Sequence, residues 1–293
     1  MEMLPREHYT WKLCTRTLAL GVRTRVMGIV NATPDSFSDG GEFVEVDAAV
    51  AHAARLLDEG ADIIDVGGES TRPGAGAGTA EAVSEVEEQR RILPVIEAVL
   101  HARPNTIVSV DTYRASTARE ALRLGAEIVN DVSGMQWDAG MAGVCAESGC
   151  GVVAMHTRGL PSEWTTQTLL RADEIVPLVM DGLRSSVAQL VNAGCVRESI
   201  VLDPGFGFGK RGDENWVLLR ELDRLRALGF PVLAGLSRKG FLRSAAASTR
   251  DELDDATATA NVIAAAGGAH VVRVHDVVRT VRATAVADAA MRG

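Results

Sequence analysis

The chain contains eight short apolar runs, and each of them ends in polar or chargeable residues. Runs of Val, Ile, Leu, Met and Ala of this length are typical of strands that are buried on both faces. The stretches between the runs are long enough for crossover helices, and eight strand–helix units close a (β/α)8 barrel. The residues that end the runs are Asn31, Arg72, Asp111, Asn130 with Asp131, His156, Asp203, Lys239, and Arg273 with His275. Such barrels carry out chemistry at the C-terminal ends of their strands, so the sequence predicts an α/β enzyme with a TIM-barrel fold.

Length and composition favour one barrel domain. The 293 residues fit a single barrel with extensions, and no Pro- or Ser-rich linker divides the chain, so we expect one domain over residues 1–293. The hydrophobic share is 46% and the aromatic share only 4%, which predicts an aliphatic core. Residues 1–24 are an N-terminal extension, and the alternation and Gly turn within residues 9–24 predict a short hairpin at the bottom of the barrel.

Charge and cysteine content restrict the partners and the compartment. The formal net charge of −9 argues against a nucleic-acid binder, because such proteins need a basic face. The four cysteines have no Cys-x-x-Cys or metal-ligand spacing, which indicates reduced thiols. Basic residues interrupt the N-terminus before a signal peptide could form, and no run approaches the roughly 18 apolar residues of a membrane span. We therefore expect a cytoplasmic enzyme for small molecules, with neither nucleic acid nor membrane as a partner.

Three acceptor-rich side chains, Asp111, Asn130 and Asp203, end strands around the expected barrel. A single Asp at such a position can simply cap the next helix. Three of them in an apolar pit would be costly unless a ligand donates hydrogen bonds to them. The glycine-rich segment DPGFGFGK at 203–210 would bring backbone close beside the carboxylate of Asp203. A planar heterocycle with amino and ring N–H donors is the ligand that this pattern favours.

A basic cluster is expected on the rim of the same barrel. Its members follow the second, seventh and eighth apolar runs and are Arg72, Arg238, Lys239, Arg273 and His275. A single Arg at a strand end is often part of a structural ion pair. Several cations together in an acidic protein favour an anion site, and barrels of this kind commonly hold phosphate near the loops after strands seven and eight. Because strand eight neighbours strand one, Asn31 is expected beside Arg273 and His275.

Two glycine-rich loops, 31–44 and 67–79, are expected over the C-terminal mouth and to order around a ligand. The first carries Asp35 and Phe37, which could cover a cationic intermediate, although a loop of this composition can also be a plain helix entry. At the end of the fifth run, Met155 is interpreted as a wall of the pit and His156 as a hydrogen-bonded structural residue.

Taken together, these segments closely resemble the dihydropteroate synthase family of the folate pathway, which sulfonamides inhibit. The resemblance runs from about residue 25 to 278, in order and with matching spacing. The motifs that carry it are MGIVNATPDSFSDGG, DVGGESTRPGA, SVDTYR, IVNDVSG, MHTRG, LDPGFGFGK, GLSRKGFL and RVHDV.

The resemblance implies a reaction and a role for individual residues. The chain would join 4-aminobenzoate to the diphosphate of 6-hydroxymethyl-7,8-dihydropterin, releasing diphosphate. The implied pterin-binding residues are Asp111, Asn130, Met155, Asp203, Lys239 and Arg273. The implied diphosphate-binding residues are Asn31, Thr71, Arg72, Arg273 and His275, with Asn31 also contacting Mg²⁺. The implied 4-aminobenzoate-binding residues are Phe37, Pro73, Phe206, Ser237 and Arg238, and the implied catalytic residues are Asp35, Asp111, Lys239 and Arg273.

The resemblance further implies Mg²⁺ as the cofactor and a homodimer as the assembly. The departures from the family pattern are small, with Ala32, Ser116 and Ala256 replacing more usual residues and none of them removing a ligand. Two other functions remain open on the same barrel. One is a pterin-binding methyltransferase barrel, which would not need the SRK and RVH clusters, and the other is a non-catalytic pterin sensor.

Overall fold

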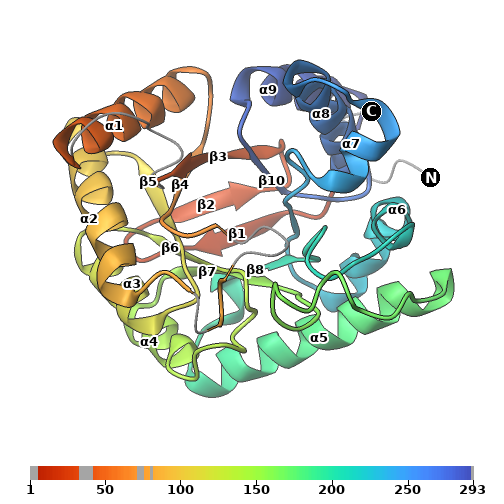
Figure 1. The fold of residues 1–293 in the computed structure, drawn as a ribbon, viewed down its shortest axis with the longest axis horizontal. Coiled ribbons are helices and arrows are strands. Elements are labelled where there is room, and N and C mark those ends of the chain that lie inside the picture. Colours follow the sequence, from red (N-terminus) through yellow and green to blue (C-terminus); the bar gives the residue numbers. More distant parts are fainter. Residues whose placement is uncertain (1–5, 33–41, 71–75, 80–81, 292–293) are drawn as a thin grey trace.

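The computed structural model describes residues 6–32, 42–70, 76–79 and 82–291, and for residues 42–45 it describes only the backbone. Eight strands form one parallel sheet in the order β8-β7-β6-β5-β4-β3-β10-β9. They are β3 (Arg25–Asn31), β4 (Ile63–Gly67), β5 (Ile107–Asp111), β6 (Ile128–Asp131), β7 (Gly151–Met155), β8 (Ile200–Asp203), β9 (Leu233–Ala234) and β10 (Val271–Val274). These are the eight predicted runs, and the helices surround them as a TIM barrel requires (Figure 1).

The barrel is nearly closed between β8 and β9, its sixth and seventh strands along the chain. The two ends of the sheet, β8 and β9, are joined by a single parallel bridge between Leu202 and Val232. The strand β9 contains only two residues, and Gly235 follows it directly. The neighbouring pair β10 and β3 is regular, with Arg273 beside Met27 and Val274 beside Gly28. The expected contact between strand eight and strand one is therefore confirmed.

The helices lie on the outside of the barrel. They are α1 (Glu42–Asp58), α2 (Glu85–Ala102), α3 (Ala115–Arg123), α4 (Met141–Ser148), α5 (Ala172–Ala193), α6 (Glu214–Arg220), α7 (Gly240–Ala246), α8 (Arg250–Ala266) and α9 (Val277–Ala290), with 3-10 turns η2 (Arg197–Ser199) and η3 (Leu222–Leu228). Between β8 and β9 the chain forms the α-helix α6 and then the 3-10 turn η3. The helix α2 runs through Pro94 and begins at a Ser84 cap. None of the described helices is long and apolar enough to cross a bilayer.

Side chains inside the barrel alternate along each strand, and their character changes from the lower to the upper half. The lower inward positions are all apolar: Met27, Ile63, Ile107, Ile128, Val153, Val201, Leu233 and Val271. Two residues further along the same strands, and therefore on the same face, lie Ile29, Asp65, Ser109, Asn130, Met155, Asp203, Gly235 and Arg273. One step of two residues along the strands thus changes the barrel interior from entirely apolar to largely polar.

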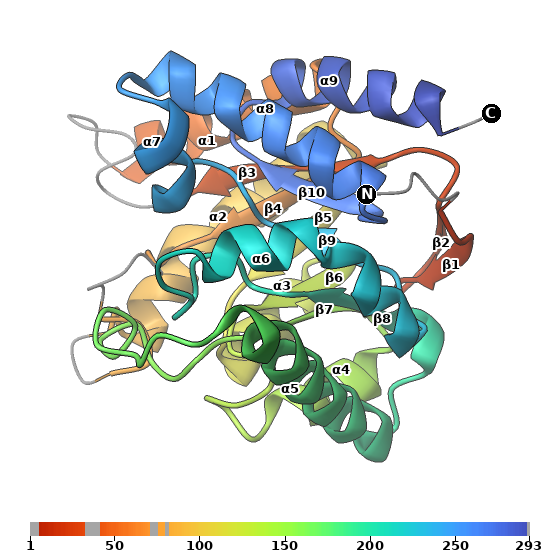
Figure 2. The same ribbon diagram turned by 90° about the vertical axis from the view of Figure 1, so that its right-hand side faces the viewer.

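The N-terminal hairpin covers the apolar end of the barrel, as the sequence predicts. Its strands β1 (Tyr9–Lys12) and β2 (Thr17–Leu20) pair in antiparallel register. Trp11 is fully buried against the lower inward residues, and its indole N–H donates to the carbonyl of Ser199 at 2.8 Å. Figure 2 shows the hairpin at one end of the barrel and α7 at the other, so the C-terminal mouth is the end that faces the viewer in Figure 1.

Candidate active site

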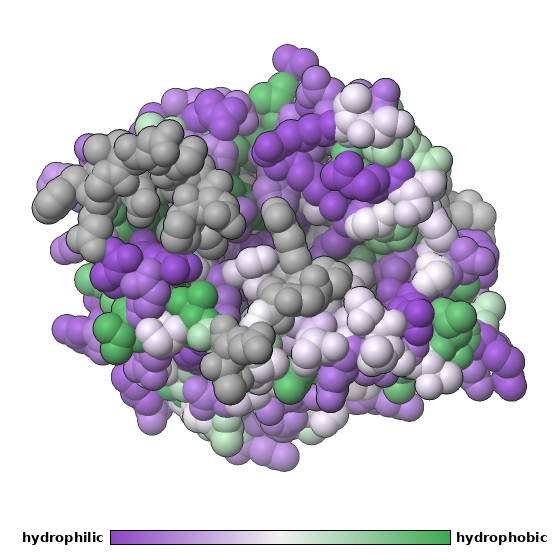
Figure 3. All heavy atoms as spheres, viewed as in Figure 1, coloured by the Kyte–Doolittle hydropathy of each residue, from purple (hydrophilic) through white to green (hydrophobic). Residues whose placement is uncertain are grey.

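Polar side chains meet at the C-terminal end of the parallel strands. We call the set formed by Asp65, Asp111, Asn130, Asp203, Lys239 and Arg273 the polar pit. Its six side chains come from β4, β5, β6, β8, β10 and the turn after β9. In the space-filling view of the mouth, hydrophilic residues gather beside the centre of this face over α7 and α9 (Figure 3). Residues that the sequence separates by more than 200 positions, Asp65 and Arg273, are here in direct contact.

Arg273 is held between two carboxylates. Its Nε donates to Asp65 at 2.6 Å and its Nη2 donates to Asp111 at 2.5 Å. Burial raises the pKa of Asp111 to about 7, and although the charge of Arg273 opposes this shift, the charge of Asp65 adds to it. Gly67 makes room for this pair, because a Cβ there would lie 3.3 Å from the Cβ of Asp111. The guanidinium therefore has a fixed plane, and the carboxylate of Asp111 faces the mouth.

Asp203 ends β8 inside a tight glycine turn. The backbone N–H of Gly205 donates to its carboxylate at 2.6 Å, and burial raises the pKa of Asp203. Gly205 adopts a φ of +68°, and a Cβ at this position would lie 2.0 Å from the carbonyl oxygen of His156, so no other residue fits. The motif thus places backbone against a buried carboxylate, as expected from the sequence.

Lys239 enters the same pit from the turn after β9. Its Nζ lies 4.1 Å from the centre of the Phe208 ring, a cation–π contact. Burial lowers the pKa of Lys239 to about 8, with the negative charge of Asp203 opposing the shift and the positive charge of Arg273 adding to it. An ammonium in this position can donate hydrogen bonds to a carbonyl or ring nitrogen of a ligand.

Asn130 and Asp131 end β6 but point to different surroundings. Asn130 is buried in the pit and donates from Nδ2 to Asp65 at 3.1 Å. Asp131 accepts from the backbone N–H and hydroxyl of Ser133 and from the backbone N–H of Met135, so it holds the turn that follows the strand. Only the first of the two residues faces the pit.

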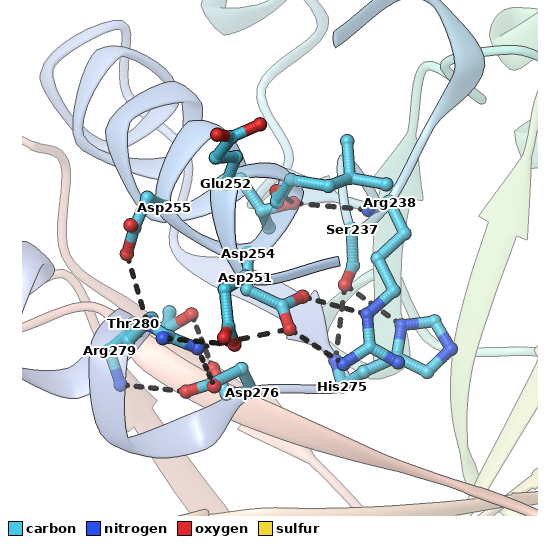
Figure 4. A network of polar contacts seen from close by, with 12 residues as sticks. Ser237, Arg238, Asp251, Glu252, Asp254, Asp255, His275, Asp276, Arg279 and Thr280 are labelled. Carbon is cyan, nitrogen blue, oxygen red and sulfur yellow. Dashed lines mark hydrogen bonds and ion pairs between the residues drawn. The ribbon is translucent and has the colours of Figure 1, made fainter. Parts of the chain in front are cut away.

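The rim after β9 and β10 is a second polar network, drawn in Figure 4. The hydroxyl of Ser237 lies 2.9 Å from Nδ1 of His275 and accepts from the backbone N–H of His275 at 3.1 Å. Arg238 has a φ of +57°, which is rare for a residue with a side chain. Its guanidinium makes two hydrogen bonds to Asp254 of α8, at 2.7 and 2.9 Å. Arg238 therefore turns its charge toward α8, while Ser237 and His275 face each other.

A third network ties the two ends of the loop after β4. The hydroxyl of Tyr113 donates to Glu69 at 2.9 Å and accepts from the backbone N–H of Gly78 at 3.1 Å. Arg114 pairs with Glu69 at 2.9 Å, and Glu69 also accepts from the backbone N–H of Val83 at 3.0 Å. Side chains that follow β5 thus fix both ends of the segment that contains residues 71–75.

Several residues singled out from the sequence lie elsewhere than expected or outside the described ranges. Phe206 is fully buried and stacks on Phe241 at 6.3 Å, so contact with a ligand ring would require its side chain to move. His156 is buried as expected, but within the described residues its Nδ1 has no hydrogen-bond partner. Met155 is buried at the end of β7 beside the pit. Asp35, Phe37, Thr71, Arg72 and Pro73 fall outside the described residues.

The sequence did not single out four residues that organise this site. Asp65 lies inside an apolar run, and its position two residues before Gly67 on the inward face was the available signal. Tyr113 and Arg114 were part of the SVDTYR segment, but nothing in their spacing pointed to Glu69. Asp254 lies on a helix whose charges read as solvent-exposed, so its contact with Arg238 had no sequence signal.

Oxygen donors suitable for Mg²⁺ are present at the mouth. Within the described residues, no group of three or more His, Cys, Asp or Glu side chains could hold a metal ion by itself. Asn31 ends β3 beside Gly67 and is partly exposed, so its amide oxygen can reach an ion at the mouth. Magnesium commonly takes one or two protein oxygens and completes its shell with water and substrate phosphates, and Asn31 fits that arrangement.

Comparison with known proteins gives a consistent result. A family model described as pterin binding enzyme matches residues 27–275. Dihydropteroate synthase of Bacillus subtilis (strain 168) is 41% identical over 267 residues, which cover 91% of this chain and 88% of that protein. The enzyme of the same name from Escherichia coli (strain K12) is 41% identical over 266 residues, covering 91% of each chain.

Solved structures with the same fold agree with this assignment. Dihydropteroate synthase from Yersinia pestis in a sulfonamide drug complex has a TM-score of 0.86 and 38% identity, and covers 98% of this chain and 100% of that one. The Xanthomonas albilineans enzyme in complex with 7,8-dihydropteroate has a TM-score of 0.81 and 39% identity, and covers 96% of this chain and 99% of that one. With this identity over nearly its whole length, the chain belongs to the dihydropteroate synthase family of pterin-binding enzymes.

Proposed function

We propose that the polar pit binds (7,8-dihydropterin-6-yl)methyl diphosphate and that the chain transfers its pterinylmethyl group to 4-aminobenzoate, giving 7,8-dihydropteroate and diphosphate. The observation that carries the proposal is the meeting of buried hydrogen-bond acceptors with two cations in one pit. Asp111, Asn130 and Asp203 present acceptors, and Arg273 and Lys239 supply the positive charge. A ligand with several N–H donors and a flat face matches this set.

The pterin would lie across the floor of the pit. Its amino group and ring N–H would donate to Asp203 and Asn130, since a carboxylate accepts two parallel N–H bonds. Lys239 would donate to the pterin carbonyl and a ring nitrogen, and Arg273 would stack on the ring face. Met155 would form an apolar wall beside the ring.

The diphosphate would lie at the rim above the pit. Asn31 ends β3 and His275 directly follows the neighbouring strand β10, and both would contact the diphosphate. Thr71 and Arg72 would complete the site from the loop that Glu69 and Tyr113 anchor. Mg²⁺ held by Asn31 and by the substrate would neutralise the charge that develops on the leaving diphosphate.

The 4-aminobenzoate would enter last, between the rim and the two loops after β3 and β4. Its carboxylate would be received by Ser237 and the first backbone N–H groups of α7. Arg238 would support this position from behind, because its charge is paired with Asp254. Phe206 would support the 4-aminobenzoate site indirectly, through its stacking on Phe241. Phe37 and Pro73 would cover the aromatic ring.

Catalysis would rest on charge placed before the reaction begins. Loss of diphosphate leaves positive charge on the pterin methylene carbon and ring, and fixed carboxylates near that carbon favour the charged state. Asp111 would act from the pit and Asp35 from the covering loop. The paired Arg273 and the protonated Lys239 keep the pterin oriented, and the covering loops would keep water from the cation until the aniline nitrogen attacks it.

The test is a coupled assay of diphosphate release with and without 4-aminobenzoate and Mg²⁺. The proposal predicts that diphosphate and dihydropteroate appear together, and only when all components are present. Asp35→Ala should lower turnover far more than it lowers affinity for the pterin diphosphate. A methyltransferase barrel would release no diphosphate. A sensor would show no turnover, and Asp35→Ala would leave its affinity for the pterin unchanged.

The same proposal includes the setting of the enzyme. We propose one catalytic domain over residues 1–293, acting in the cytoplasm on small molecules, as a homodimer that binds neither nucleic acid nor membranes. Support comes from the acidic net charge of −9 and from the family to which the chain belongs. Sedimentation of the purified protein at micromolar concentration would test the dimer.

A further inference from the structure

We propose that Asp65 is a positioning residue of the pterin pocket, which sets the orientation of Asn130 and Arg273 without contacting the substrate. This inference rests on the proposed function and adds a residue that the sequence motifs did not single out. Asp65 lies on β4 with a side chain that is 0% exposed, in contact with both groups. Its role is therefore exerted from inside the barrel.

One oxygen of Asp65 joins two sides of the pit. Oδ2 accepts from Nε of Arg273 at 2.6 Å and from Nδ2 of Asn130 at 3.1 Å. In the sheet order, β4 is separated from β10 by β3 and from β6 by β5. The contacts therefore reach across the barrel interior in both directions, and a shift of Asp65 would move both partners.

The contact with Asn130 decides which atom of the amide faces a ligand. A carboxylate can only accept, so Asn130 must turn its NH₂ group toward Asp65. The amide oxygen is then the atom left for the mouth, and within the described residues no hydrogen bond occupies it. Asn130 thereby presents an acceptor beside the acceptors Asp111 and Asp203. Without Asp65 the amide could rotate and present a donor to the N–H groups of the pterin.

The contact with Arg273 keeps the guanidinium in place when substrate binds. Of its two carboxylate partners, Asp111 is 15% exposed and Asp65 is 0% exposed. A substrate can therefore compete for Asp111, but it cannot reach Asp65. If Asp111 turns toward the reacting carbon, the bond from Nε to Asp65 still fixes the plane that stacks on the pterin.

The remaining oxygen of Asp65 indicates that the carboxylate is not there for stability. Within the described residues, Oδ1 has no hydrogen-bond partner, and the hydroxyl of Ser109, its cross-strand neighbour, has none either. Burying an acceptor without a donor is unfavourable, and the residue two positions earlier on β4 is the apolar Ile63. An apolar residue at position 65 would suit the fold, so the presence of a carboxylate is explained by its hydrogen bonds to Arg273 and Asn130.

The test compares Asp65→Leu, which removes the acceptor, with Asp65→Asn, which keeps one acceptor oxygen without the charge. Ser109→Ala is the matched control, because Ser109 lies beside Asp65 and makes no hydrogen bond. Affinity for the pterin diphosphate is measured by calorimetry, and the KM for 4-aminobenzoate by diphosphate release. We expect Asp65→Leu to weaken pterin affinity by about tenfold or more, Asp65→Asn to weaken it by a smaller factor, and Ser109→Ala to change it by less than about twofold. The KM for 4-aminobenzoate should stay within about threefold in all three.

A double-mutant cycle asks whether Asp65 acts through Asn130. In an Asn130→Ala background, Asp65→Leu should weaken pterin affinity by no more than about threefold, because one of the two groups that it positions is gone and only the effect through Arg273 remains. An equal loss in both backgrounds would overturn the proposal, as would wild-type affinity in both Asp65 variants. If Asp65→Leu does not fold, Asp65→Asn decides by the same comparison with Ser109→Ala. Failure of the wild-type chain to bind the pterin diphosphate would instead refute the proposed function.

Discussion

The lower and upper halves of the barrel interior are built from the same eight strands but differ in what they do. The lower positions are apolar on every strand and are closed off by Trp11 of the hairpin. Two residues further along, the same strands carry the polar pit around Arg273. The lower half gains free energy from burial, whereas the upper half buries charge at a cost. In this chain, therefore, inward positions that stabilise the fold and inward positions suited to chemistry lie only two residues apart on the same strands.

The comparison predicts that substitutions in the two halves have separable effects. A truncation in the lower half should reduce the free energy of unfolding and leave the catalytic constants of the folded enzyme unchanged. Removal of a charge from the polar pit in the upper half should lower the catalytic constants and leave the free energy of unfolding nearly unchanged. Each prediction below can break this separation or make it sharper.

Trp11→Ala should have the largest effect. The indole is fully buried at the bottom of the barrel and bonds to the carbonyl of Ser199, so truncation should lower the free energy of unfolding by about 3–5 kcal/mol. The measurement is urea unfolding followed by circular dichroism. Lys12→Ala, on an exposed position of the same hairpin strand, should change stability by less than about 0.5 kcal/mol. A fall in kcat of the folded Trp11→Ala enzyme would show that the two halves are not independent.

Asp111→Asn should lower kcat/KM for the pterin diphosphate by about 100-fold or more, since it removes the carboxylate that we propose stabilises the reacting carbon. Stability should change little or rise, because burial already raises the pKa of Asp111 to about 7 and so disfavours its ionised form in the folded chain.

The control is Asp131→Asn, one strand away. Its carboxylate is buried but holds the turn of Ser133 and Met135 outside the pit. This variant should lose stability and keep its catalytic constants. Similar catalytic constants in Asp111→Asn and Asp131→Asn would mean that activity depends on any buried carboxylate at these strand ends, and not on a carboxylate inside the polar pit.

The strands, their order and the end of the barrel that carries chemistry could all be predicted from the sequence, because aliphatic runs and their polar ends repeat eight times. Asp111, Asn130, Asp203 and Arg273 were recognisable since each ends a run. Asp65 was not, because it lies inside an apolar run, where its only signal was its position on the inward face two residues before Gly67.

Partners across long sequence distances were the other part that could not be predicted. Arg238 was expected to contribute its charge to the rim, but both carboxylate oxygens of Asp254 on α8 bind one edge of its guanidinium. Phe206 was expected to contact a ligand at the mouth, yet its ring is fully buried and stacks on Phe241. In both cases the packing of helices on the barrel decides where the side chain points, and periodicity carries no information about that packing.

The upper half should also give a pH dependence that the lower half does not. The proposed mechanism requires protonated Lys239 and ionised Asp111. Since burial lowers the pKa of Lys239 to about 8, its charge is lost as pH rises through that value. Since burial raises the pKa of Asp111 to about 7, its charge is lost as pH falls through that value. A profile of kcat/KM for the pterin substrate should therefore be bell-shaped, because this constant reports the free enzyme.

Lys239→Arg tests the alkaline side of this profile. Arginine stays protonated over the whole range, so the fall in kcat/KM above pH 8 should disappear even if the maximum is lower. An unchanged alkaline limb would assign it to another group. Trp11→Ala should keep the profile of the wild-type enzyme, because it touches neither titrating side chain.

The smallest expected effect comes from Tyr113, whose hydroxyl connects Glu69 to the backbone N–H of Gly78. Tyr113→Phe removes these two bonds and the bond that the hydroxyl accepts from Nη2 of Arg114 at 2.7 Å. The substitution should cost about 0.5–1.5 kcal/mol and loosen the ends of the loop that carries Thr71 and Arg72. The KM for the pterin diphosphate should rise by about two- to tenfold, measured by diphosphate release at saturating 4-aminobenzoate. Tyr9→Phe is the matched change at the other end of the barrel, where the hydroxyl bonds to Glu7, and should leave KM unchanged. Equal effects of the two substitutions would mean that the loss of any tyrosine hydroxyl, at either end of the barrel, weakens substrate binding, and the division between a stabilising end and a reacting end would fail.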